Sequence, residues 1–178
     1  MMILGLDPGL AALGWGMVAL LGDTPGWIGH GVIKTSKQRG LAKGRDLELR
    51  VSGLARQLGV ILDTYQPIAA AMEEFRFYGR ALPSTLQLAN VTGMLRELLR
   101  TRGVGVVSYS ARELKMAVTG SATAPKWQVQ RMVKRLLHLE SIPKPQHAAD
   151  ALAVAITLAR HAAKSPLTMT QSHGNFTP

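Results

Sequence analysis

Asp7 is the first residue of this sequence placed to do chemistry. It follows the apolar run 2–6, which predicts a strand, and precedes the turn residues Pro8 and Gly9. An ionised carboxylate is costly to bury unless it is paired, so an Asp on a core strand predicts a cation nearby. The local sequence equally allows Asp7 to cap the turn through its own side chain.

Four further candidates stand at the boundaries of later elements. The apolar run 68–72 predicts a buried strand that ends in Glu73 and Glu74. Two strands that each carry an acid at the C-terminal end favour a site at the rim of an open α/β sheet. His147 and Asp150 are three residues apart at the start of the last predicted helix, so they share one of its faces.

The remaining elements must position these side chains, and their pattern predicts an α/β fold. Strands at 14–20 and 27–33, joined by a turn at 22–26, predict an antiparallel meander with the first strand. Their glycines either weaken the strands or mark a close approach of the backbone to another element. Further elements are predicted at 42–65 (helix), 83–99 (helix), 104–109 (strand), 111–118 (helix), 126–138 (helix) and 146–162 (helix).

Two of these helices carry specific expectations. In the helix 42–65, Asp46 and Glu48 are predicted on the solvent side, without a functional role. The helix 83–99 is apolar on nearly all sides, so it must bury more than one face. It is either a central core helix or a helix that packs on the sheet and on a second subunit.

The charge of the chain indicates a polyanionic partner. The formal net charge is +10, and nine basic but only two acidic residues lie between positions 100 and 144. Such an excess favours nucleic acid, although a basic surface without a partner has the same composition. In the helix 126–138, Lys126, Arg131 and Lys134 are predicted to face outward toward phosphates, and Trp127 inward.

A second candidate for DNA contact is the predicted loop after Glu74. It interleaves rings and guanidinium groups at Phe75, Arg76, Phe77 and Arg80. Rings of this kind stack on or wedge between bases while the Arg side chains hold phosphates. The alternative is a loop whose rings fold back onto the core.

Composition excludes several classes of protein. The chain has 178 residues and no cysteine, which excludes disulfides, thiol nucleophiles and thiolate-bound metals and fits a cytoplasmic location. The longest apolar stretch, 148–159, is too short for a membrane span and contains Asp150. We expect one domain of ordinary size at 1–163 and a disordered tail at 164–178, which is rich in Ser, Thr, Gln, Gly and Pro.

Five motifs follow one another along the chain and extend over all of it except the tail: 3–9 (ILGLDPG), 72–74 (MEE), 114–120 (LKMAVTG), 128–133 (QVQRMV) and 147–153 (HAADALA). In this order and at this spacing they resemble the RuvC family of Holliday junction resolvases, which have a ribonuclease H-like fold. The resemblance implies a mixed five-stranded sheet, three strands antiparallel and then parallel, flanked by helices. It also implies a homodimeric endonuclease that uses Mg²⁺ or Mn²⁺ to make paired nicks in four-way DNA junctions during recombination and repair. A branch-migration helicase complex of the RuvA and RuvB type is the implied partner.

The resemblance also assigns roles to single residues. The catalytic and metal-binding acids of the family fall on Asp7, Glu73 and Asp150, and His147 stands where many members have Asp. The phosphate-binding lysines of the family match Lys115 and Lys126. The ring placed near the crossover is Phe75 or Phe77, and Glu74 has no family counterpart.

Physical chemistry makes this set of side chains coherent as a metal site. Three carboxylates and an imidazole converge only if divalent cations offset their repulsion, and two cations suit an in-line phosphodiester displacement. Imidazole suits transition metals better than Mg²⁺, so His147 favours Mn²⁺. His147 as a general base instead of a ligand stays open at this stage.

Three other classes of protein share parts of the pattern. In actin-like ATPases and sugar kinases the phosphate-binding loop also follows a strand that carries Asp and Gly. These proteins need a second such domain, however, and the 178 residues show no second Asp-x-Gly strand. Pre-rRNA-processing nucleases of the same superfold lack the long basic insertion. A DNA-binding module without catalysis remains if His147 has spoiled the site.

Overall fold

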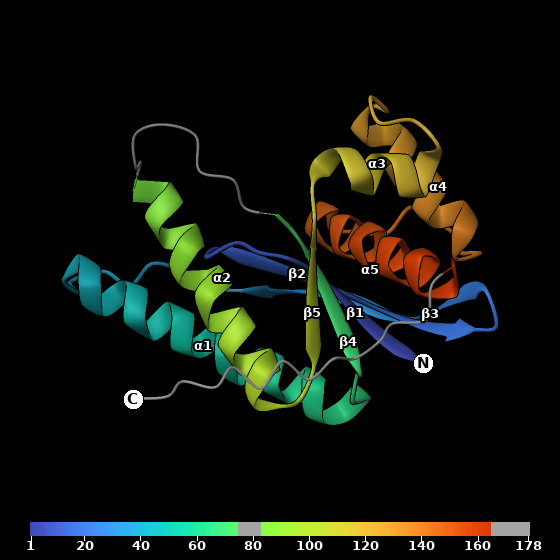
Figure 1. The fold of residues 1–178 in the computed structure, drawn as a ribbon. Coiled ribbons are helices and arrows are strands. Elements are labelled where there is room, and N and C mark those ends of the chain that lie inside the picture. Colours follow the sequence, from blue (N-terminus) through green and yellow to red (C-terminus); the bar gives the residue numbers. More distant parts are fainter. Residues whose placement is uncertain (75–82, 165–178) are drawn as a thin grey trace, which may run out of the picture.

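The computed structural model describes residues 1–74 and 83–164, which form a five-stranded sheet covered by helices on both faces (Figure 1). The strands lie in the order β3-β2-β1-β4-β5. Strands β1, β2 and β3 pair antiparallel, whereas β4 pairs parallel with β1 and β5 pairs parallel with β4. The elements are β1 (Met2–Asp7), β2 (Ala12–Leu21), β3 (Thr24–Lys34), α1 (Lys43–Tyr65), β4 (Ala69–Glu73), α2 (Pro83–Thr101), β5 (Gly105–Tyr109), α3 (Ala111–Thr119), α4 (Lys126–Leu136) and α5 (Gln146–Lys164). The predicted α/β class and mixed sheet are confirmed.

The helices α3, α4 and α5 cover one face of the sheet (Figure 1). The core on this side is built around α5, whose buried positions are mostly alanine, such as Ala151 and Ala155. Small side chains let a helix axis lie close to the sheet, and α5 is buried along almost its whole length. The element that carries His147 and Asp150 is therefore the most deeply packed helix among the described residues.

The helices α1 and α2 cover the other face (Figure 1). Strand residues Leu4, Leu6 and Met72 alternate with those that face α5, and they pack against leucines of both helices. Each strand thus buries both of its faces, which is why β1 and β4 are apolar runs with no polar alternation.

The hairpin between β2 and β3 is tighter than predicted. Leu21 pairs with Thr24, so the turn contains only Gly22 and Asp23, and Gly22 has a φ of 58°. Pro25 lies within β3, which is possible because β3 is an edge strand of the sheet.

Helix α4 is shorter than predicted. It ends at Leu136 instead of His138, because His138 adopts a left-handed φ of 51°.

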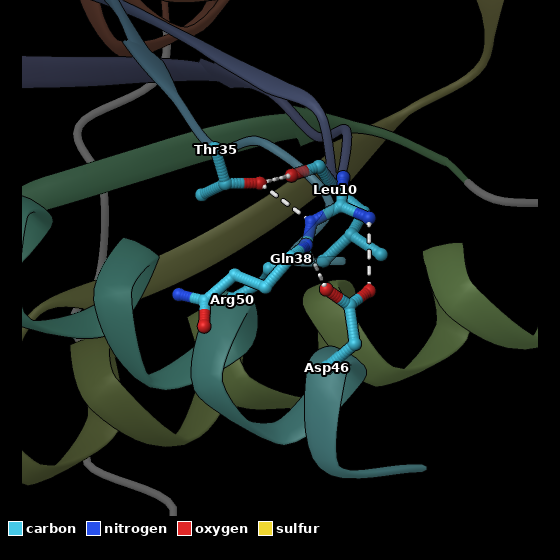
Figure 2. Close-up of polar contacts among 5 residues, drawn as sticks. All are labelled: Leu10, Thr35, Gln38, Asp46 and Arg50. Carbon is cyan, nitrogen blue, oxygen red and sulfur yellow. Dashed lines mark hydrogen bonds and ion pairs between the residues drawn. The ribbon is translucent and has the colours of Figure 1, made fainter. Parts of the chain in front are cut away.

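The expectation that Asp46 faces solvent is wrong. Only 6% of Asp46 is exposed, and it forms a polar cluster with Arg50, Thr35, Gln38 and Leu10 (Figure 2). Its Oδ1 accepts a hydrogen bond from the backbone N–H of Gln38 at 2.8 Å, and its Oδ2 lies 3.5 Å from Nη1 of Arg50.

The same cluster reaches the loop that follows β1. Nε of Arg50 donates to Oγ1 of Thr35 at 2.9 Å, and that hydroxyl donates to the carbonyl of Leu10 (Figure 2). The backbone N–H of Thr35 donates to the carbonyl of Ala11. These bonds fasten the turn after Asp7 to the end of β3 and to α1. Glu48, by contrast, is exposed as expected and pairs with Arg45 at 2.8 Å.

Helix α2 buries one stripe, formed by Val91, Leu95 and Leu99. Leu86 is 56% exposed, and a Cβ built on Gly93 would meet no atom within 4 Å. Met94 packs against the core on the α1 side. The expected second buried face is therefore not supplied by the described part of this chain.

None of the described helices is long and apolar enough to cross a membrane. Helix α5 includes Lys164, the first residue of the predicted tail, and residues 165–178 lie outside the described residues. The domain boundary at 163 stays a prediction.

Candidate active site

Two adjacent parallel strands bring Asp7 and Glu73 to the same edge of the sheet. In the β1–β4 ladder Leu6 is level with Met72, so the two acids are the next residues on neighbouring strands. Each acid is the last residue of its strand, at the end of an apolar run, and Asp7 is followed by the turn residues Pro8 and Gly9. The register thus confirms that the two predicted strand-end acids are brought together.

Glycines on the sheet place the remaining candidates beside Asp7. Gly14 is the antiparallel partner of Asp7, and a Cβ built there would overlap the carbonyl oxygen of His147. A Cβ on Gly5 would overlap the carbonyl oxygen of Ala151 and would lie 2.6 Å from the backbone nitrogen of Ala155. Because these positions have no side chain, α5 lies directly on β1 and β2. The close approach that the strand glycines predicted is confirmed at Gly14.

Two short polar contacts join the last helix to its neighbours. Nδ1 of His147 lies 2.6 Å from Oδ2 of Asp7, and Nζ of Lys126 donates to Oδ2 of Asp150 at 2.7 Å. The Asp7 and Asp150 side chains are 22% and 26% exposed, whereas their partners are about half exposed. The Asp7 carboxylate therefore reaches across to α5, which supports the expectation that it is paired.

The surroundings disfavour negative charge at both strand-end acids. Partial burial raises the pKa of Asp7, and the nearby Asp150 carboxylate adds to the rise, while the hydrogen bond from His147 opposes it. Partial burial likewise raises the pKa of Glu73, with added repulsion from Asp7 and Asp150. Three carboxylates are thus close enough to repel one another, so a positive charge bound between them would be stabilising.

Two lysines supply part of that charge. Lys126 opposes the rise in pKa at both Asp7 and Glu73, and Lys115 opposes it at Glu73. Lys115 lies in α3, which begins with a capping box between Ser110 and Glu113. Lys126 opens α4. The structure therefore brings both lysines to the acids.

The donor set fits a divalent cation in its chemistry. Carboxylate oxygens and an imidazole are ligands for Mg²⁺ and Mn²⁺, and the mutual repulsion at Asp7, Glu73 and Asp150 is the kind that a cation offsets. In the conformation described, an oxygen of Asp150 is taken by Lys126 and an oxygen of Asp7 by His147. Within 1–74 and 83–164, no three such side chains gather closely enough to enclose an ion.

The predicted DNA-contact residues divide into two groups. Arg131 is exposed on α4 and Lys134 is partly exposed, as expected of an outward face. Phe75, Arg76, Phe77 and Arg80 lie outside the described residues, so their role stays a prediction.

Sequence reasoning missed Trp127, which was expected to face inward but is 59% exposed. The side chains of α4 that pack on the core are Val129, Met132, Val133 and Leu136. At 3.6 residues per turn, Trp127 lies on the opposite side of the helix from these four. A helical projection of α4 contains this signal, whereas the general tendency of Trp to be buried points the other way.

Comparison with known proteins agrees with this geometry. Residues 3–158 match the family model for the crossover junction endodeoxyribonuclease RuvC. The RuvC of Pseudothermotoga lettingae is 37% identical over 155 residues, which is 87% of this chain and 91% of the relative.

Solved structures of the family have the same fold. Thermus thermophilus RuvC superposes with a TM-score of 0.80 at 32% identity, covering 92% of this chain and 96% of that one. A structure of T. thermophilus RuvC in complex with a Holliday junction substrate gives 0.79 at 30% identity, with 93% and 97% covered. The ribonuclease H-like fold is thereby confirmed, and the chain belongs to the RuvC family of crossover junction endodeoxyribonucleases.

Proposed function

We propose that this nuclease resolves four-way DNA junctions by paired nicks, with Asp7, Glu73, His147 and Asp150 as its catalytic and metal-binding residues. The observation that carries the proposal is the convergence of acids from β1, β4 and α5, with Lys115 and Lys126 close by. T. thermophilus RuvC, whose fold this chain shares, has been solved with a Holliday junction. We propose that the enzyme acts in recombination and repair, and that it is cytoplasmic, where it has access to the DNA.

Nucleases of this family use a divalent metal, and the chain supplies oxygen and nitrogen donors for it. A divalent cation would be held by Asp7, Glu73 and Asp150, and when bound it supplies Lewis acidity toward water and toward the scissile phosphate. Lys115 and Lys126 attract the phosphate and reduce the repulsion between DNA and the carboxylates. Nζ of Lys126 holds Oδ2 of Asp150 in this conformation, and the same ammonium group would be free to contact a DNA phosphate if Asp150 held a cation.

We assign His147 as a ligand and propose that it shifts the preference of the site toward Mn²⁺. With Nδ1 engaged by Asp7, Nε2 is the ring nitrogen left for another partner. Imidazole binds transition metals better than it binds Mg²⁺. The competing role, a general base, uses the same nitrogen and is separated by the metal dependence of a variant, described below.

We propose that affinity for the junction comes from the basic helix α4 and from the residues that follow Glu74. We propose that Arg131 and Lys134, with Lys115 and Lys126, hold phosphates without reading sequence. We propose that one ring, Phe75 or Phe77, meets the crossover, where unstacked bases are available, and that Arg76 and Arg80 hold phosphates.

Two nicks placed symmetrically require two equivalent sites, which a two-fold dimer supplies. We propose α2 as the interface, because it leaves Leu86 and the surface around Gly93 uncovered. Met94 in the same helix packs on the core, so Leu86 is the better position for testing the interface. A helicase complex of the RuvA and RuvB type is proposed as the partner that delivers the junction.

The test is cleavage of an end-labelled four-way junction with added Mg²⁺ or Mn²⁺, beside a linear duplex of the same arms and an ATP-turnover assay. The wild type should cut the junction at symmetric positions, leave the duplex intact and turn over no ATP. Asp7→Asn should bind the junction and cut it slower by on the order of a hundredfold or more, because a ligand to the cation is worth several kcal/mol. Tight binding with no cleavage by the wild type in either metal would instead identify a DNA-binding module.

A further inference from the structure

An exposed tryptophan stands at the end of α4 that borders the acids. Lys126 contacts Asp150 at 2.7 Å, and the next residue, Trp127, is 59% exposed. The guanidinium carbon of Arg131, one turn further along, lies 5.9 Å from the centre of the Trp127 ring. A cation over the ring face at this distance is attracted by the ring and limits its motion. The ring is therefore held at the surface, one residue along α4 from the lysine that contacts Asp150.

The surroundings of the ring are basic, which restricts the partner. Arg131 and Arg135 follow Trp127 at one-turn spacing on the exposed side of α4, and Lys126 precedes it. A large apolar ring on a positive surface suits a partner that offers flat apolar faces together with negative charge. A nucleic acid has both, because every base has a π-face and every linkage has a phosphate.

We propose that Trp127 stacks on a base of the bound DNA beside the cleaved phosphate, and that Arg131 positions the ring and contacts the backbone. This inference rests on the proposed function, since it concerns the same DNA. Stacking gives a contact that does not depend on charge, whereas the nearby lysines contact the phosphates through charge. It holds the nucleotide next to the scissile bond, where phosphate contacts alone leave the strand free to slide.

The chain offers a matched control at Trp27. It is also exposed, at 46%, but it lies on the edge strand β3 and donates from Nε1 to His30 at 2.9 Å. The variants are Trp127→Ala, Trp127→Phe, Arg131→Gln and Trp27→Ala, each checked by thermal unfolding. Because both Trp side chains reach solvent, folding is expected to survive the substitutions.

Binding is measured to the four-way junction in EDTA, across a range of salt concentrations. Each protomer of the proposed dimer carries one such ring, so Trp127→Ala should weaken binding by at least about 5- to 150-fold, the range for loss of one stacked base. Trp127→Phe should keep most of the affinity, and Trp27→Ala all of it. Stacking involves no counterions, so Trp127→Ala should leave the slope of log Kd against log salt unchanged, whereas Arg131→Gln should reduce it by about one for each protomer that contacts the DNA.

A junction with abasic sites flanking the mapped cut isolates the base. The wild type should bind it less tightly than the intact junction, and Trp127→Ala should bind the two equally. The proposal is overturned if Trp127→Ala binds the intact junction as the wild type does, or if its loss matches that of Trp27→Ala. It is also overturned if the wild type binds the abasic junction as tightly as the intact one, since the ring then makes no contact with a base. If the wild type binds and cuts the junction and Trp127→Ala does so equally well, this inference alone is refuted. If the wild type neither binds nor cuts the junction, the proposed function is refuted as well.

Discussion

At the scale of single residues, Glu73 carries a charge that its surroundings disfavour. Because the pKa of Glu73 is raised in the fold by partial burial and by Asp7 and Asp150, the folded protein holds its proton more tightly than the unfolded chain does. As the pH rises from the ordinary value of 4.5 through the raised value, folding loses stability. The metal-free enzyme therefore bears a cost at neutral pH that a bound cation removes.

Replacing Glu73 by Gln should remove that cost. We expect Glu73→Gln, without metal, to have a higher free energy of unfolding than the wild type at pH 7, and no advantage at a pH below about 4, where the wild-type carboxyl is protonated. Urea unfolding at the two pH values measures this. Glu140→Gln, at an exposed acid outside the cluster, is the control and should show no such pH-dependent gain. Equal stability of Glu73→Gln and wild type at pH 7 would show that the repulsion is relieved in another way.

His147 sets the chemical character of the site at the same scale. We expect the wild type to cut faster with Mn²⁺ than with Mg²⁺ at equal concentration, and His147→Asp to narrow that difference, because a hard oxygen replaces a nitrogen ligand. Rates of both proteins in each metal give the result. An unchanged ratio of the two rates, with activity lost in both metals alike, would favour a general base.

At the scale of elements, the strand-end acids were predictable because a short apolar run that ends in an acid is a local signal. Asp7 and Glu73 follow directly from it, and the parallel pairing of β1 with β4 then sets the acids side by side. The burial of Asp46 is less local, since it depends on the loop around Gln38 folding over α1. A signal did exist: Asp46 and Arg50 continue, in steps of four, the stripe of buried leucines that begins at Leu54.

The contact between α5 and the sheet is the element-scale feature that the sequence predicted only in outline. Glycine in a strand allows a close approach, but it does not say which element approaches. The structure shows that Gly14 admits the backbone of His147, opposite Asp7. Two residues far apart in sequence are thus aligned by the absence of a side chain.

Gly14→Ala should therefore damage both packing and catalysis. The added Cβ overlaps the backbone of His147, which must shift away from Asp7, and overpacking of this kind costs about 1–3 kcal/mol. We expect a lower unfolding midpoint and a drop in junction cleavage larger than the drop in junction binding. Gly53→Ala in α1 is the matched control, since a Cβ there meets no atom within 4 Å, and it should stabilise the helix by up to about 1 kcal/mol. Wild-type cleavage by a folded Gly14→Ala would mean that α5 can move without disturbing the site.

At the scale of the whole molecule, the uncovered side of α2 sets the last expectation. A two-fold interface repeats every contact, so one substitution removes two. Leu86→Asp exposes a charge in place of an apolar side chain whose burial is worth about 1.5–3 kcal/mol, and the loss counts once for each protomer. We expect monomers in sedimentation velocity at concentrations where the wild type is a dimer.

The functional consequence separates a dimer defect from a site defect. Monomers of Leu86→Asp should leave single nicks in the junction instead of paired ones, because each retains an intact set of acids. Val60→Asp, at an equally exposed position of α1, should remain dimeric and make paired nicks. A wild type that sediments as a monomer even with junction bound would contradict the dimer, and paired nicking by a monomeric Leu86→Asp would show that two sites need not be joined before they act.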